Sequence, residues 1–216
     1  MTVAPAPTLD ELRARVDQMQ GRPAAQPVAT HPAFAGLLQL QTGSSYAVDS
    51  ASLAMALMAG PSADGAWCAV VGSAEFGLEA AAAAGVELRR TILVPDPGKA
   101  WLEATAALID VLGVVVVAAP SGVSAKDVSR IGARLRQRGS VLIAYGDWPR
   151  CDARLSLRDA EWVGLGRGHG HLQARRVTVE VRRGTAPPRT GRLWLPDRDQ
   201  AIRPVEQQPV QLRSVG

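Results

Sequence analysis

The chain has 216 residues, of which 47% are hydrophobic, and its formal net charge is +4 at pH 7. This length supports one substantial core and is too short for two ordinary domains. No apolar stretch reaches the ~18 residues of a membrane span, and the first residues lack the regions of a secretory signal, so we expect a cytoplasmic protein. Two cysteines, Cys68 and Cys151, are too few for a disulfide framework and are expected to stay reduced.

The amino-terminal segment predicts a short amphipathic helix. Thr8 and Glu11 have the spacing of a capping box, and apolar residues recur at intervals of three and four, at Leu9, Leu12, Val16 and Met19. A helix of about a dozen residues is marginal alone, so it must pack on its own core or on another chain. Residues 22–32, rich in Pro and Ala, predict a linker. We therefore expect a separate segment at 1–32 and a core at 33–195.

The segment at 43–50 is in register with the phosphate-binding pattern G-x-x-x-x-G-K-[ST], between the apolar run 37–40 and a helical pattern. Gly43 and Ser50 match it, whereas Val48 replaces the second glycine and Asp49 replaces the lysine. The glycine lets the backbone approach the ligand, and the lysine neutralises the β- and γ-phosphates. Because an aspartate would repel that ligand, we expect a loop that has lost nucleotide binding.

The next segments predict an α/β fold with a mostly parallel sheet flanked by helices. Apolar runs typical of strands buried on both faces occur at 67–71, 114–117 and 141–145. Helical patterns separate these runs, at 101–112 and at 124–138.

The carboxyl-terminal third has a different pattern. Alternating sequences predict antiparallel strands at 160–163, 175–181 and 191–195. His169 and His171 lie in a segment that we interpret as a turn, and we expect no metal there because zinc needs about four ligands. Residues 196–216 show no sustained periodicity and predict a disordered tail.

In the order and spacing of these segments, residues 36–184 resemble the core of the RecA recombinase family. The most specific stretch is 67–110, in which the segment 71–78 is similar to the strand of this family that ends in its catalytic glutamate, at Glu75 here. Ala118 ends the next buried strand, where a nucleoside triphosphatase normally carries an aspartate for Mg²⁺. With Val48 and Asp49, this substitution predicts that ATP is not hydrolysed.

A RecA-like chain of this length with a degenerate nucleotide site resembles the ImuA family of mutasome accessory proteins, which act in damage-induced mutagenesis. The resemblance implies a non-catalytic scaffold without a cofactor, cytoplasmic and associated with the nucleoid after DNA damage. Its partners would be an ImuB-like non-catalytic homologue of lesion-bypass polymerases, an error-prone replicative-type polymerase and, as a further candidate, RecA. Two alternatives stay open: a cell-division inhibitor similar to SulA, and a weak RecA-like ATPase that keeps Glu75 as its base. Direct contact with DNA also stays open.

Arginine supplies 22 of the 24 positive residues, and it makes forked contacts to phosphate and carboxylate. Three arginines recur every four residues beside the apolar stripe of the helix at 124–138. Such a run is usually a solvated face, and it is also a candidate surface for DNA or a protein. With the four apolar residues of the amino-terminal helix, the candidate partner-binding residues are Arg130, Arg134, Arg138 and Trp194.

Overall fold

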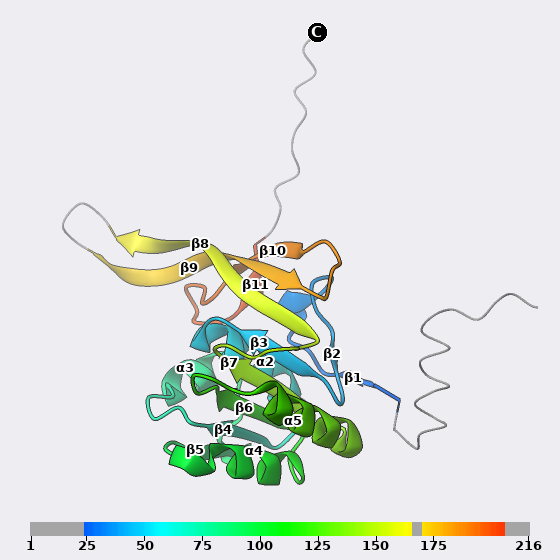
Figure 1. Cartoon of the computed structure of the whole chain (residues 1–216). Helices are drawn as coiled ribbons and strands as arrows, with labels where there is room; N and C mark the ends of the chain where they lie inside the picture. Colours follow the sequence, from blue (N-terminus) through cyan, green and yellow to red (C-terminus); the bar gives the residue numbers. More distant parts are fainter. Residues whose placement is uncertain (1–23, 166–169, 206–216) are drawn as a thin grey trace, which may run out of the picture.

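The computed structural model describes residues 24–165 and 170–205, which form a nine-stranded sheet with helices on both faces of its parallel part (Figure 1). The strand order is β11-β10-β9-β8-β3-β7-β6-β4-β5. The expected α/β class is confirmed, with a mostly parallel sheet flanked by helices and antiparallel strands on the carboxyl-terminal side.

The parallel part of the sheet contains the most buried strands. Its members are β3 (Ser45–Val48), β4 (Cys68–Val71), β5 (Thr91–Val94), β6 (Val114–Ala118), β7 (Val141–Tyr145) and the start of β8 (Ala153–Leu165). Every residue of β3 and β4 is buried, because both faces of these strands are covered. At the edge of the sheet, β5 is more open, and Ile92 and Leu93 are each 37% exposed.

Helices form a layer on each face of the sheet. On one face, α2 (Ala51–Ala63) and α3 (Leu78–Ala83) pack with alternate strand residues such as Val70 and Val116. On the other face, α4 (Trp101–Ile109) and α5 (Ala125–Arg138) cover the intervening residues, including Val71 and Val117. Short 3-10 turns connect these elements, at Pro32–Phe34 (η1), Leu88–Arg90 (η2) and Gly98–Ala100 (η3).

The carboxyl-terminal strands extend the sheet beyond its helical layers. β9 (Gly170–Arg182), β10 (Arg189–Trp194) and β11 (Arg203–Pro204) are successively antiparallel, and the β8–β9 hairpin projects from the body of the molecule (Figure 1). The pairing of β8 with β9 shifts between Arg158 and Glu161, where Asp159 has a φ of 50°. Such a bulge reverses the alternation of side chains along a strand. The bulge therefore places Trp162, with its partner Arg175, on the side of the sheet that faces α2.

Two parts of the sequence-based organisation are wrong. Within the predicted linker, β1 (Pro27–Val28) pairs with β2 (Leu40–Gln41), and the chain at His31 packs against Gly60 of α2. Within the predicted tail, β11 pairs with β10 and Ile202 is buried. Both errors have the same reason, since a strand of two residues has no periodicity to detect.

Candidate functional site

The predicted nucleotide loop is mostly a strand. Ser45–Val48 form β3, which lies between β7 and β8 in the sheet, and Val48 is buried at its end. Only Asp49 and Ser50 connect β3 to α2, and Ser50 is the N-cap, its Oγ accepting a hydrogen bond from Leu53 N at 3.2 Å. The expectation of a loop over 43–50 is therefore wrong. The preceding apolar run contributes Leu37, Leu38 and Leu40 to the core.

Asp49 has a structural partner. Its carboxylate accepts a hydrogen bond from the backbone N–H of Leu157 on β8, with oxygen–nitrogen distances of 3.2 and 3.1 Å. The Asp49 N–H donates to Leu155 O at 3.3 Å, so the residue is tied to β8 through both its backbone and its side chain. A lysine could not accept from this N–H. The carboxylate at position 49 thus has a structural role, since it satisfies a backbone N–H of β8.

Three of the predicted nucleotide-site residues lie at the carboxyl ends of the parallel strands. Asp49 follows β3, Glu75 lies in an exposed turn after β4, and Ala118 ends β6. The backbones that follow β4 and end β6 lie close together there: a Cβ added to Gly72 would be 3.2 Å from Ala118 O. Gly43 lies apart from them, at the amino end of β3, where its φ is +75° and Arg136 of α5 packs against it.

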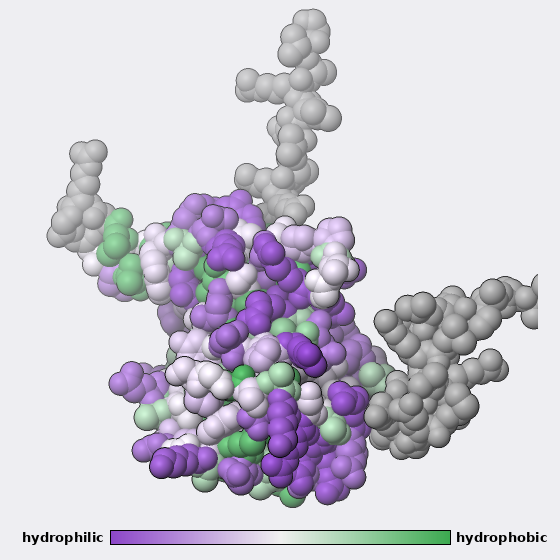
Figure 2. All heavy atoms as spheres, viewed as in Figure 1, coloured by the Kyte–Doolittle hydropathy of each residue, from purple (hydrophilic) through white to green (hydrophobic). Residues whose placement is uncertain are grey.

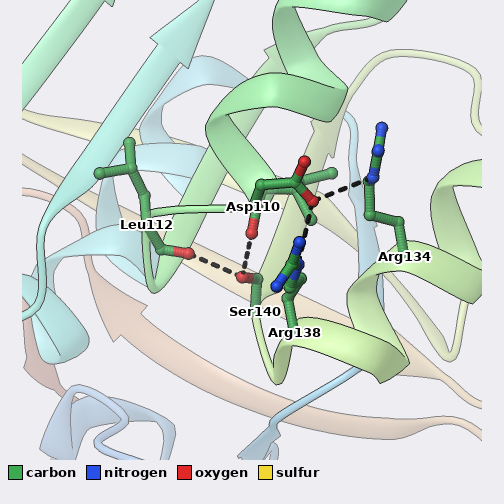
Figure 3. A network of polar contacts seen from close by, with 6 residues as sticks. Asp110, Leu112, Arg134, Arg138 and Ser140 are labelled. Carbon is green, nitrogen blue, oxygen red and sulfur yellow. Dashed lines mark hydrogen bonds and ion pairs between the residues drawn. The ribbon is translucent and has the colours of Figure 1, made fainter.

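The arginines of α5 are joined to α4. Asp110 follows the last residue of α4, and its Oδ1 lies 3.0 Å from Arg134 Nε and 3.2 Å from Arg138 Nε (Figure 3). Beside this pair, the buried Ser140 hydroxyl lies 2.7 Å from the carbonyl oxygens of both Ile109 and Leu112. Two of the three arginines thus serve a contact between helices. Arg130 instead lines a cavity of about 420 Å³ between α4 and α5.

The side of the hairpin that faces α2 carries a second candidate surface. Arg175 lies over the Trp162 ring, 5.4 Å from its centroid, and donates to Ser52 Oγ of α2 at 2.8 Å. These side chains line a mostly apolar cavity of about 270 Å³, together with Met55 and Ile202. Trp162 is 47% exposed. Sequence reasoning missed this surface, because the bulge at Asp159 that orients Trp162 has no simple sequence signal.

Of the other predicted partner-binding residues, only Trp194 is among the described residues. Trp194 ends β10 and is half-buried, on the side of the sheet opposite the buried Leu193 and Leu195. Leu9, Leu12, Val16 and Met19 lie outside the described residues, so that the predicted amino-terminal helix stays a prediction.

Three further properties limit the chemistry of the described chain. Burial raises the pKa of the Cys68 thiol to about 11, so this side chain stays neutral at physiological pH. Across residues 24–165 and 170–205, no three His, Cys, Asp or Glu side chains come together as a metal site. In the same part of the chain, no helix is both long and apolar enough to cross a membrane.

Comparison with known proteins assigns the chain to a family. Residues 33–150, more than half of the chain, match the model of the MT3502 N-terminal domain. The chain belongs to this family. Uncharacterized protein Rv3395c of Mycobacterium tuberculosis (strain ATCC 25618 / H37Rv) is 34% identical to it over 140 residues. The aligned region spans 62% of this chain and 62% of that relative. The match over 33–150 covers β3 to β7, and hence the junction at Asp49.

Proposed function

We propose that this member of the MT3502 N-terminal domain family is a non-catalytic RecA-like scaffold in a DNA-damage-induced complex for error-prone translesion synthesis. Its partners would be an ImuB-like polymerase homologue and an error-prone replicative-type polymerase, with RecA as a further candidate. The resemblance of residues 36–184 to the RecA core supports this proposal. At the level of fold class, the mostly parallel sheet with antiparallel strands after β8 also supports the proposal.

The junction between β3 and α2 is the observation that carries the non-catalytic part of the proposal. A phosphate-binding loop needs several residues whose backbone N–H groups surround the phosphates, between a strand and the start of a helix. Here the connection has two residues, and both side chains are used: Asp49 accepts from Leu157, and Ser50 caps α2. A nucleotide would find neither the loop nor the cation that its phosphates need.

The absence of an aspartate at the end of β6 supports the same conclusion. Ala118 has no side-chain oxygen with which to hold a Mg²⁺ shell, and Glu75 lies in an exposed turn. A carboxylate in water cannot act as a general base on a nucleotide that is not positioned beside it. The chain would therefore act by binding its partners.

Deletion of the gene in the source organism tests this function. We expect the frequency of ultraviolet-induced resistance mutations to fall to near the spontaneous level, and wild-type and Glu75→Gln chains to restore it equally. Unchanged induced mutagenesis in the deletion strain would refute the proposed function. If Glu75→Gln fails to restore mutagenesis although it accumulates normally, the non-catalytic proposal is contradicted when the purified wild-type chain also hydrolyses ATP and the variant does not.

The SulA-like alternative has its own readout in the same strains. A division inhibitor would cause filamentous growth when it is overproduced, including in cells that lack the ImuB-like partner. We expect cells of normal length.

A further inference from the structure

The antiparallel extension of the sheet has an outer face that carries many arginines. We define this outer face by Arg154 and Arg158 on β8, Arg176 and Arg182 on β9, and Arg192 and Trp194 on β10. They face away from the buried side chains of the same strands, such as Val177 and Leu193. Figure 2 shows many hydrophilic residues where β8, β9 and β10 join the body of the molecule, and hydrophobic residues towards the projecting end of the β8–β9 hairpin.

The register of the three strands arranges these residues in rows. Arg158 and Arg192 both lie opposite Thr178, one on each side of it. In the next row, Arg176 lies between Glu161 and Trp194. Because neighbouring strands are about 4.8 Å apart, Arg158 and Arg192 lie two strand spacings, or roughly 10 Å, from each other. Trp194 is two residues from Arg192 on the same side of β10.

The charges of the outer face are only partly balanced from within. Two glutamates lie on the same side of these strands, and each already forms an ion pair: Glu161 with Arg176, and Glu180 with Arg182 at 2.7 Å. The hydrogen bond from Arg176 lowers the pKa of Glu161, and the charge of Arg192 lowers it further. Among the described residues, Arg158 and Arg192 form no ion pair, and the contact of Arg154 with Asp147 is long, at 3.9 Å. Arg154 also donates one N–H to the backbone oxygen of Trp148 at 2.8 Å. Because a guanidinium has five donors, its remaining N–H groups, and those of Arg158 and Arg192, can contact an external anion.

We propose that single-stranded nucleic acid binds across the outer face, with phosphates on Arg154, Arg158 and Arg192 and a base against Trp194. Guanidinium groups bind phosphate oxygens in a forked geometry. Binding of single strands typically combines such a cationic track with an aromatic side chain on which a base stacks. A sheet face that carries both is suited to this ligand. The inference goes beyond the proposed scaffold function and does not depend on it.

Two of the three α5 arginines that sequence analysis singled out are less suited to this role. Arg134 and Arg138 of α5 already share the carboxylate of Asp110. A phosphate would have to compete with this carboxylate. On the outer face it would meet arginines without such a partner.

Fluorescence anisotropy with a labelled oligo(dT) of about 25 nucleotides tests the proposal on the full chain. We expect binding at about 50 mM salt that weakens as salt increases. The triple variant Arg154→Gln, Arg158→Gln and Arg192→Gln should bind at least tenfold more weakly, and its slope of log K against log salt should be shallower by about two. The matched control, Arg89→Gln, Lys99→Gln and Arg136→Gln, loses the same charge at exposed positions elsewhere and should stay within about twofold of wild type.

Trp194 provides a second, independent variant. Trp194→Ala should weaken binding roughly tenfold with an unchanged salt slope, because stacking releases no counterions. Trp194→Phe, which keeps an aromatic ring, should retain most of the affinity, and Trp67→Ala should have no effect. No binding of oligo(dT) at about 50 mM salt would overturn the proposal. Equal weakening in the outer-face and control triple variants would also overturn it. Equally effective competition by polyglutamate would overturn it too, because that result would indicate a surface for acidic proteins.

Discussion

The carboxylate of Asp49 accepts from the backbone N–H of Leu157, with both oxygens within 3.2 Å of the nitrogen. The pairing of β3 with β8 ends at Val48 and Leu155, so this side chain continues the contact after β3 has ended. The residue that breaks the phosphate-binding pattern is thus part of the junction between the parallel sheet and its antiparallel extension. The proposed loss of nucleotide binding and the attachment of the hairpin thus involve the same residue.

Asp49→Lys should destabilise the fold by about 1 kcal/mol, since a typical intramolecular hydrogen bond contributes that much and lysine offers no acceptor. Asp49→Asn keeps one oxygen and should lose less. Urea unfolding of the purified variants measures both free energies. Equal stability of wild type and Asp49→Lys would mean that the contact with Leu157 contributes nothing.

Gly60→Ala should destabilise the protein by about 1–3 kcal/mol and lower its Tm by roughly 3–10 °C. The added Cβ would lie 2.4 Å from His31 N and 2.7 Å from Thr30 C, both backbone atoms that cannot move separately from the chain. Gly132→Ala is the matched control in α5, where the nearest atom is the flexible end of Arg136 at 3.4 Å. The control should gain about 0.5–1 kcal/mol from the better helix propensity of alanine. If both variants melt at the same temperature, residues 29–31 do not pack on α2.

Ser140→Ala should cost about 1–3 kcal/mol, because it removes the donor shared by the Ile109 and Leu112 carbonyls at the end of α4. The hydroxyl is buried, so water cannot replace it easily. Ser129→Ala is the control, since that exposed hydroxyl only donates to Ala125 O within α5. We expect it to be neutral or slightly stabilising in thermal unfolding. An equal loss in both variants would contradict the role assigned to Ser140.

Sequence reasoning located the strongly patterned elements well. The run at 141–145 is β7 with the same bounds, and the predicted helix after Ser124 ends at Gly139, whose φ of 70° is the left-handed conformation that glycine favours. In both cases one local signal determines the element. Burial on two faces requires a continuous apolar run, and a cap requires a particular residue.

It failed where a tertiary contact decides the structure. Ser45–Val48 lie inside the segment that is in register with a loop pattern, yet they form a central strand because β7 and β8 lie on either side of them. β11, with two residues, has no local strand signal and is defined by its neighbour, whereas the β-branched run of β5 was a signal that sequence analysis did not use. For the candidate sites, the spacing of the α5 arginines was visible in sequence, but their partner Asp110 was not. Arg158 and Arg192 were overlooked, although the alternation of their strands could have placed them on one face.

The amino-terminal segment is expected to bind another chain through its apolar stripe. The double variant Leu12→Asp and Val16→Asp should weaken binding to the ImuB-like partner, RecA or a second copy, while the Tm stays nearly unchanged. Burial of the four apolar side chains would contribute on the order of 6 kcal/mol before ordering costs. Pull-down and thermal unfolding measure the two effects separately. An earlier unfolding with all partners retained would mean that the segment packs on its own core.

Isothermal titration of the purified chain with the ImuB-like protein encoded in the same genome, with and without ATP and Mg²⁺, tests the central claim most directly. The account predicts a complex with the same Kd in both conditions, and no heat when ATP and Mg²⁺ are titrated into the chain alone. A complex that forms only with ATP, or no complex in either condition, would contradict it.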